Sequence, residues 1–289
     1  MKTTPRSSSH RRSQHDVTRD EHHVNARKDE LASFLRSRRR RLTPADVGLP
    51  HGGRRRISSL RREDVAWLAD IGITWYTWLE QGRPIKVAHD TLQRIASALR
   101  MDASESEYLE KLVRRHEEAG GVWQLPVCEH VRAFVEGYGE GYSALVGPRQ
   151  DVLACNRAYA RLYGLSANGE AGVLQRNTLW TMFTGEAARA LFPAWEDVAR
   201  RLLAIFRFAY ADYVGEPAFE TLIETLCERS TEFSTMWADL DVLAPTSWSI
   251  GPINDPVLRR PVALDTVTLT VPNAPGQTLI IHSAKSPAT

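Results

Sequence analysis

Cysteine is scarce in this sequence, and long apolar runs are absent from it. The 289 residues include three cysteines, Cys128, Cys155 and Cys227, none of which stands in a CxxC pair. The low number excludes a disulfide framework, and the spacing excludes a cysteine-rich zinc site. No stretch approaches the roughly 20 apolar residues that a membrane span needs, and no apolar segment follows the charged N-terminus as in a secretory signal. We therefore expect a soluble, cytoplasmic protein that does not enter membranes.

The sequence also lacks the motifs of common enzyme classes. It contains no GxSxG nucleophile elbow, no HExxH zinc motif and no P-loop. Gly137, Gly139 and Gly141 form a GxGxG string, but no strand clearly precedes it and no further glycine completes a dinucleotide-binding fingerprint. We predict that the protein is not an enzyme, and the sequence indicates neither a metal ion nor a cofactor.

Charge is divided unevenly along the chain. Residues 1–120 contain 24 basic and 17 acidic side chains, whereas residues 121–289 contain 13 and 18. The excess is greatest in residues 28–62, which hold 11 basic side chains, nearly all arginine, and 3 acidic ones. Arginine favours bidentate contacts with phosphate, so the first half of the chain is predicted to bind a polyanion. A solvated basic face is the alternative that charge alone leaves open.

Hydrophobic periodicity divides the chain into two domains. Residues 1–24 have no periodic pattern, which predicts a disordered tail. Residues 25–117 show short amphipathic helices, which predict an all-α domain, and a capping box of Ser104 and Glu107 opens the last of them. Residues 118–130 are interrupted by glycine and proline and are predicted to form a linker.

Residues 131–289 combine both periodicities and predict a mixed α/β (α+β) domain. Its strands are expected at residues 142–147, 151–155, 262–271 and 277–284. Its helices are expected at residues 156–164, 195–209 and 217–228.

A helix-turn-helix is predicted in residues 60–84, LRREDVAWLADIGITWYTWLEQGRP. Two short helices meet at a turn near residues 70–72. Ala66 and Ala69 are small enough for the second helix to cross the first, while Ile71 and Tyr76 supply an inner apolar face. In such a motif the second helix lies in the major groove of DNA, with its N-terminal residues at base edges.

This segment resembles the XRE (Cro/repressor-like) helix-turn-helix superfamily. With the basic stretch FLRSRRRRLTPADVGLPHGGRRR before it, the pattern is similar to that of the bacterial MmyB-like transcriptional regulators. The resemblance continues in NTLWTMFTG, in FPAWEDVARRLLAIFR and in STEFSTMWADLDV, and it covers most of residues 28–285. It implies a PAS-like C-terminal domain, an antiparallel sheet with helices across one face, that binds a small apolar ligand such as an acyl chain.

The resemblance also implies which residues contact DNA. It places Arg62 beside the DNA backbone, and it places five residues on the exposed face of the second helix: Ile73, Thr74, Trp75, Thr77 and Trp78. The arginine clusters add candidates for phosphate contacts, namely Arg39, Arg54, Arg55, Arg56 and Arg83. Ile73 and Trp78 stand where the superfamily favours polar readers, so methyl contacts, phosphate contacts and DNA shape are expected to carry recognition. Packing of Trp75 and Trp78 in a core is the alternative.

Large apolar side chains of the second domain are the candidates for ligand contacts. We select Trp180, Trp195, Phe206, Phe233 and Trp237, with an ordinary apolar core as the alternative. Arg207 lies close to the apolar stripe of the helix at 195–209. It is a candidate to bind a ligand carboxylate, or to pair with Asp212 or Glu196 instead.

Together these patterns predict a sequence-specific, DNA-binding transcriptional regulator whose DNA binding a small apolar ligand modulates. Double-stranded DNA is the expected partner, bound by a homodimer at half-sites about one helical turn (~34 Å) apart. A constitutive DNA-binding regulator whose C-terminal domain serves only dimerisation is the alternative. We expect the protein in the cytoplasm, associated with the nucleoid.

Overall fold

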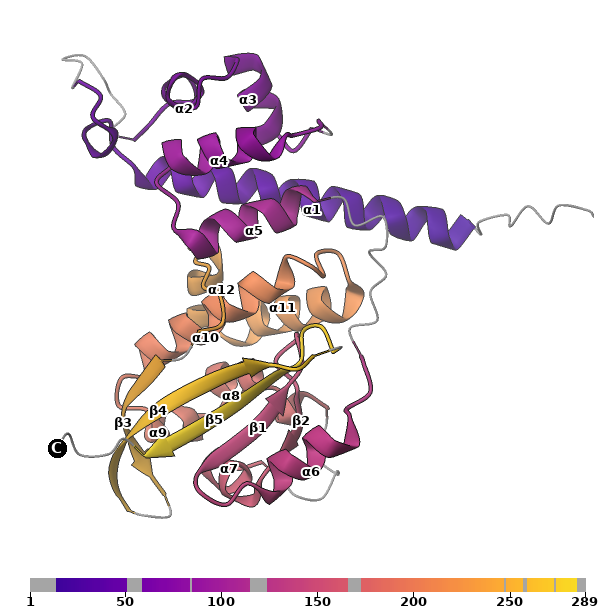
Figure 1. Ribbon diagram of the computed structural model, residues 1–289, viewed down its shortest axis with the longest axis vertical. Helices are drawn as coiled ribbons and strands as arrows, with labels where there is room; N and C mark the ends of the chain where they lie inside the picture. Colours follow the sequence, from indigo (N-terminus) through magenta and orange to yellow (C-terminus); the bar gives the residue numbers. More distant parts are fainter. Residues whose placement is uncertain are drawn as a thin grey trace, which may run out of the picture.

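The computed structural model describes residues 14–50, 59–83, 85–114, 124–165, 173–246, 248–256, 259–272 and 274–284. A helical N-terminal part is stacked on a C-terminal part that contains a β-sheet, and the long helix α1 (Gln14–Arg41) runs across the N-terminal part (Figure 1). The predicted all-α domain followed by an α+β domain is thus confirmed.

The N-terminal part is entirely helical where the structure describes it. Besides α1 it contains η1 (Ala45–Val47), α2 (Arg62–Leu68), α3 (Ile73–Glu80), α4 (His89–Ala98) and α5 (Ala103–Val113). Since α1 begins at Gln14, residues 14–24 of the expected tail are helical, while residues 1–13 lie outside the described part. The cap of α5 also differs from the prediction. Asp102, not Ser104, accepts the N–H of Glu105 at 2.8 Å, and Glu105 accepts the N–H of Asp102 at 3.1 Å.

The turn between α2 and α3 has the expected place and geometry. Asp70 adopts a left-handed conformation with φ of 51°, which asparagine and aspartate tolerate better than most residues. The N–H of Ile71 donates to the carbonyl of Ala66 at 3.0 Å, a bond that closes the end of α2. Arg94 of α4 donates to the Asp70 carbonyl at 3.0 Å and holds the turn from outside.

The helices of the N-terminal part enclose one apolar core. Fully buried side chains come from α1, α2, α3, α4 and α5: Phe34, Leu35, Val65, Tyr76, Leu79, Ile95, Tyr108 and Leu109. Phe34 and Tyr108 pack edge to face with ring centroids 4.9 Å apart. The core fixes the orientation of α3 relative to α1, so the outer face of α3 is held rigidly.

The C-terminal part contains five strands and seven helices in the portion that the structure describes. The strands are β1 (Tyr142–Val146), β2 (Val152–Cys155), β3 (Trp248–Asp255), β4 (Arg260–Thr270) and β5 (Thr278–Ala284). The helices are α6 (Glu129–Gly137), α7 (Arg157–Leu162), α8 (Thr178–Thr184), α9 (Glu186–Leu191), α10 (Trp195–Tyr210), α11 (Pro217–Arg229) and α12 (Thr231–Ala238), with the short η2 (Val173–Arg176). The four strands and three helices expected here are all present.

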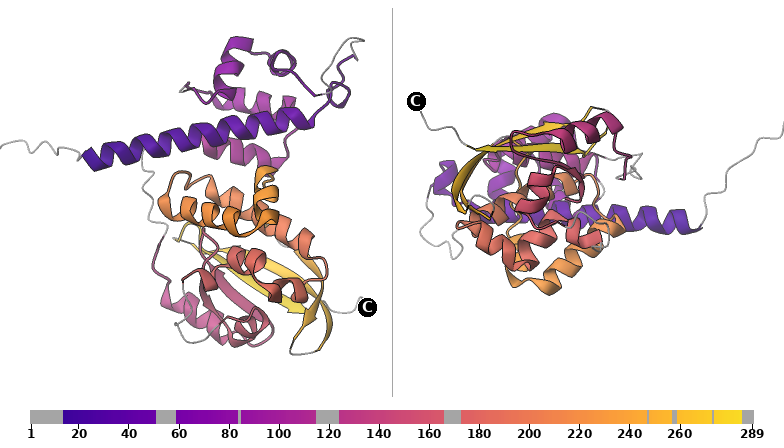
Figure 2. Two further views of the ribbon diagram at one scale, coloured as in Figure 1. Left: turned by 180° about the vertical axis from the view of Figure 1, so that it is seen from behind. Right: turned by 90° about the horizontal axis from the view of Figure 1, so that it is seen from below.

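The strands form one antiparallel sheet in the order β2-β1-β5-β4-β3. On one face, Val135 of α6 packs against Leu145, Ala154 and Leu279. The helices α7, α8, α9 and α10 lie towards the other face, whereas α11 and α12 pack on α8 and α10 and lie between the sheet and the N-terminal helices (Figures 1 and 2). The sheet therefore has one thickly covered face and one partly open face.

The two parts meet along α1 and α5 on one side and α10 with the segment after α12 on the other. Arg38 donates to the Leu240 carbonyl, Arg41 forms an ion pair with Asp241 at 2.7 Å, and Ser104 accepts the N–H of Ala244 at 3.0 Å. The buried apolar side chains of the two parts belong to one continuous cluster, so these polar contacts supplement an apolar interface.

Candidate nucleic-acid interface and ligand cavity

The outer face of α3 is open to solvent at the end of the molecule away from the sheet (Figure 1). Ile73 is 48% exposed, Trp78 is 39% exposed, and Thr74 is also exposed. Thr77 is half-buried, and Trp75 turns inward and packs against the core. The face predicted for DNA thus presents three of its five residues fully, and Trp75 takes the alternative place in the core.

Glu80, at the end of α3, is fully buried and binds two arginines. It accepts two hydrogen bonds from Arg39 of α1, at 2.9 and 2.7 Å, and one from Arg62 of α2 at 3.1 Å. Burial acts to raise the pKa of Glu80, but the hydrogen bonds and charge of Arg39, with those of Arg62, outweigh it and hold the pKa below its ordinary value. The three residues join α1, α2 and α3 through one carboxylate.

The structure therefore does not present Arg39 as a phosphate contact. Its guanidinium is occupied by Glu80 and by the Leu60 carbonyl at 2.8 Å, and its side chain is 13% exposed. Arg62 shares Glu80 yet remains 41% exposed, so it still faces solvent. Arg83 is exposed, with its guanidinium 5.7 Å from the centre of the Trp78 ring. Arg54, Arg55 and Arg56 lie outside the residues that the structure describes.

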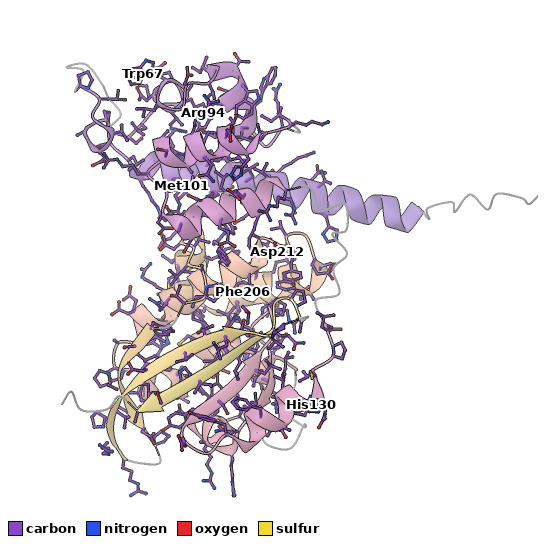
Figure 3. All side chains as sticks on the ribbon, in the orientation of Figure 1. Trp67, Arg94, Met101, His130, Phe206 and Asp212 are labelled. Carbon is purple, nitrogen blue, oxygen red and sulfur yellow. The ribbon has the colours of Figure 1, made fainter. Side chains whose placement is uncertain are left out.

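Trp67 is a surface residue that the sequence pattern did not single out. It lies on α2, is 71% exposed and stands at the end of the molecule remote from the sheet (Figure 3). Together with Ile73 and Trp78 it gives this end three exposed large apolar side chains.

A cavity of about 530 Å³ lies between the covered face of the sheet and α10. This volume is in the range of ligand sites, and such sites are mostly apolar with a few polar groups. The apolar lining consists of Val146, Val152, Tyr159, Tyr163, Leu165, Met182, Ala188, Phe192, Val198, Leu202, Ile205, Phe208, Ala209, Trp248, Ile250 and Ile280. The polar lining includes Lys111, Gln150, Thr178, Asp212, Tyr213, Thr266, Gln277 and His282.

None of the six residues predicted to contact the ligand lines this cavity. Trp180, Trp195, Phe206, Arg207, Phe233 and Trp237 lie elsewhere. The Phe206 ring packs against Trp237 at 5.9 Å, and the Trp237 ring stacks on Phe233 at the same distance. Trp195 is buried too, and its indole N–H donates to the Met182 carbonyl at 3.0 Å. These aromatics form the ordinary core that the sequence left open as the alternative.

The prediction failed for Phe206 and Arg207 because α10 is buried on two sides, only one of which faces the cavity. Val198, Leu202, Ile205 and Ala209 form a stripe that faces the cavity. A second stripe, with Phe206 and Tyr210, faces α11 and α12. Both stripes have helical spacing, so periodicity alone does not distinguish them.

Arg207 forms a structural pair, but with neither acid that the sequence suggested. The side chain is 1% exposed and binds Glu30 of α1 and the Trp237 carbonyl. Its guanidinium lies 3.5 Å from the centre of the Trp237 ring. Glu30 also accepts the Tyr108 hydroxyl at 2.6 Å. Arg207 therefore ties α10 to the N-terminal part and is not a ligand contact.

His282 is a buried titratable residue in the cavity wall. Its Nδ1 lies 2.8 Å from the Thr266 hydroxyl, and its ring stacks with Tyr159 at 6.0 Å. Burial lowers the pKa of His282 to about 4, below its ordinary value of 6.5. The histidine is therefore neutral at physiological pH and donates or accepts one hydrogen bond at each ring nitrogen.

The low pKa of His282 predicts a loss of stability in acid. Between pH 6.5 and 4 the unfolded chain binds a proton at this residue and the folded chain does not, so the free energy of unfolding falls as the pH falls. From pH 6.5 to 5 the loss is about 2 kcal/mol. Urea unfolding at both pH values will measure it, and His282→Gln is expected to reduce the loss by about that amount. The exposed His130→Gln serves as control; an equal loss in both variants contradicts the assignment.

Neither a membrane-spanning helix nor a metal centre is found in the described part of the chain. No helix there has the length and apolar character needed to cross a bilayer. No three histidine, cysteine, aspartate or glutamate side chains among the residues described lie together in a way that suits a metal ion.

Comparison with known proteins yields two family matches. Residues 30–109 match a helix-turn-helix domain, and residues 127–289 match the MmyB-like transcription regulator ligand binding domain. None of the curated proteins matches this chain. The second match covers more than half of the 289 residues. The exposed α3 lies in the first matched segment, and the residues that line the cavity, except Lys111, lie in the second. The chain therefore belongs to the MmyB-like transcription regulators, with a DNA-binding helix-turn-helix domain and a ligand-binding domain.

Proposed function

We propose that this protein binds DNA sequence-specifically and that an apolar ligand in its C-terminal domain controls this binding. The observation that carries the proposal is the mostly apolar cavity of about 530 Å³ in a chain whose α3 is exposed at the opposite end. A cavity of this size is not needed to pack a domain, because protein interiors are normally filled to crystal-like density.

The lining favours an elongated hydrocarbon such as a fatty-acyl chain. The cavity extends from the α5 and hairpin end, at Lys111 and Gln277, to His282 in the sheet and Phe192 after α9. Its walls are aliphatic and aromatic along this length, with threonine hydroxyls on the β4 side. The PAS-like interpretation of the domain is supported by the antiparallel sheet with helices on one face and a cavity between them.

For DNA recognition we propose that the N-terminal half of α3 enters the major groove. Ile73 and Thr74 then lie at base edges, where an isoleucine side chain suits the thymine methyl group. Arg62 and Arg83, on either side of α3, contact phosphates. We keep Arg54, Arg55 and Arg56 as proposed phosphate contacts and withdraw Arg39, whose guanidinium binds Glu80.

Replacing Arg83 with alanine is expected to weaken DNA binding without changing sequence preference. Each lost phosphate contact lowers the slope of log affinity against log salt by about 0.9. The effect is measured by fluorescence anisotropy with a duplex selected from a random pool, over a range of salt concentrations. Arg229→Ala, an exposed arginine on α11 of the other domain, is the matched control and should leave the slope unchanged. A wild-type slope in Arg83→Ala contradicts the phosphate contact.

A constitutive regulator whose C-terminal domain only dimerises is the second candidate. One observation favours self-association: Val267 and Leu269, on the less covered face of β4, are 41% and 49% exposed. We propose a homodimer in either case, because two-fold operators pair with two-fold proteins. The two candidate functions differ in whether a ligand changes the affinity for DNA. Native mass spectrometry of the purified protein, followed by extraction, identifies any small molecule that it carries. A co-purified acyl compound supports the first function. An empty dimer whose melting temperature no lipid shifts supports the second.

A further inference from the structure

One residue of the cavity wall belongs to the DNA-binding domain. Lys111 lies near the end of α5, inside the segment that packs against α1. Its ammonium lies 2.7 Å from a carboxylate oxygen of Asp212 and 4.5 Å from the centre of the Phe208 ring. Asp212 and Phe208 belong to the C-terminal domain and also line the cavity. An ion pair between the two domains therefore lies at this end of the cavity.

The charges at this end favour an anion. Asp212 lies close enough to Arg27 of α1 for its charge to act on that guanidinium, and Arg27 also donates to the Lys111 carbonyl at 3.1 Å. Two cations of the DNA-binding domain thus face one carboxylate here. If Lys111 releases Asp212, Arg27 still compensates the aspartate, and the ammonium is left for a second negative group.

A neighbouring polar group of the cavity is also incompletely satisfied. Gln277 is 2% exposed, and its Nε2 donates to the Leu125 carbonyl at 2.9 Å. Its Oε1 has no hydrogen-bond partner among the residues that the structure describes. A buried polar atom without a partner is costly, and Gln277 lines the same cavity as Lys111 and Tyr213. An amide oxygen accepts hydrogen bonds and does not bind an anion, so Gln277 marks this end of the cavity as polar without adding to the charge argument.

We propose that the ligand carries an anionic head group that binds Lys111 in place of Asp212, so that loading the cavity breaks an ion pair between the two domains. The proposal rests on the proposed function and specifies how the cavity communicates with α3. The hydrocarbon lies along α10, and the head group reaches α5. Figure 3 places Asp212 on the side of the C-terminal part that faces the N-terminal helices.

Breaking this pair changes the restraint on the DNA-binding domain. The remaining contacts of α10 with this domain centre on Arg207 and Glu30, which hold α1. Lys111 is on α5, whose other anchor, Ser104, bonds the N–H of Ala244. Ligand that engages Lys111 therefore frees one end of α5 from Asp212, just after α10, while α1 stays attached. By linkage, if the ligand changes the affinity for DNA by some factor, DNA changes the affinity for the ligand by the same factor.

The test compares decanoate with decan-1-ol, which share a chain length and differ in head-group charge. Calorimetric titration of the full chain at about pH 8 is expected to give decanoate a roughly 10- to 100-fold higher affinity, as a hydrogen bond to a charged partner contributes. Lys111→Met keeps the apolar stem and should abolish this preference, and Lys111→Arg should restore it. Asp212→Asn removes the competitor and should tighten decanoate severalfold without affecting decan-1-ol.

The exposed Lys86→Met is the matched control, since it removes a lysine of the same domain away from the cavity. Equal affinity of both probes for the wild-type chain overturns the proposal and leaves the proposed function intact. A decanoate preference that survives in Lys111→Met also overturns it. Binding of neither probe contradicts the acyl-type ligand of the proposed function. The proposal predicts that Lys111→Met weakens decanoate binding, that Asp212→Asn strengthens it, and that neither changes the affinity for decan-1-ol. An ion pair with a merely structural role does not produce these opposite effects.

Discussion

Replacing Glu80 with glutamine is expected to lower the free energy of unfolding of the helix-turn-helix domain by about 3 kcal/mol, as is typical when one partner of a buried ion pair is lost. The change leaves Arg39, only 13% exposed, without its counter-charge and removes the link between α1 and α3. DNA binding should weaken in parallel, because α3 loses its fixed orientation. Hydrogen exchange of the α3 amides measures the loss directly, since it reports local opening.

The exposed Glu107→Gln, on α5, is the control and should be nearly neutral. A second signature is the pH dependence. The pKa of Glu80 in the folded protein lies below its ordinary value of 4.5, so its contribution to stability is complete above that pH and is lost as the pH falls through the lower value. If the α3 amides exchange at the same rate in Glu80→Gln as in Glu107→Gln, the Glu80 carboxylate does not hold the domain together.

Replacing Ala209 with tryptophan is expected to reduce decanoate affinity at least 100-fold while leaving the fold intact. Ala209 faces the cavity from α10 between Ile205 and the polar end, so the indole fills space that a ligand occupies. Large side chains destabilise a packed core, but here an open volume of about 530 Å³ receives the ring. Saturating decanoate should raise the melting temperature of the wild-type chain by several degrees and leave that of Ala209→Trp unchanged.

The control is Ala187→Trp on the exposed side of α9, which should bind decanoate as the wild type does. An unchanged decanoate affinity in Ala209→Trp means that the ligand binds elsewhere. A variant that is unfolded by circular dichroism is replaced by Ala209→Phe, which fills less of the same volume and keeps the experiment decisive.

Local signals were sufficient to predict the helix-turn-helix. The turn depends on Asp70 and on the Ile71 to Ala66 hydrogen bond, both within a few residues. The buried Tyr76 and the exposed Ile73 and Thr74 follow from helical spacing on α3. Four of the five described strands were likewise predicted, whereas β3 (Trp248–Asp255) was not.

Long-range pairing explains what the sequence did not predict. Arg39 and Glu80 are 41 residues apart, and Glu30 and Arg207 are 177 residues apart, so no local pattern links them. Lys111 was missed as a cavity residue because it belongs to the other domain. The aromatic residues of α10 and α12 were assigned to the ligand because size and hydrophobicity are shared by core and cavity walls. What distinguishes them is which side of α10 faces empty space, a property of the packed structure.

The most direct test of ligand control is the DNA affinity of the full chain with and without decanoate, measured by fluorescence anisotropy on a duplex selected from a random pool. If ligand controls DNA binding, decanoate changes the affinity of the wild-type chain at least about fivefold, within the usual range of coupling between sites, and does not change that of Ala209→Trp. Decanoate that binds the wild-type chain by calorimetry yet leaves its DNA affinity unaltered would contradict ligand control, and the C-terminal domain would then serve assembly alone.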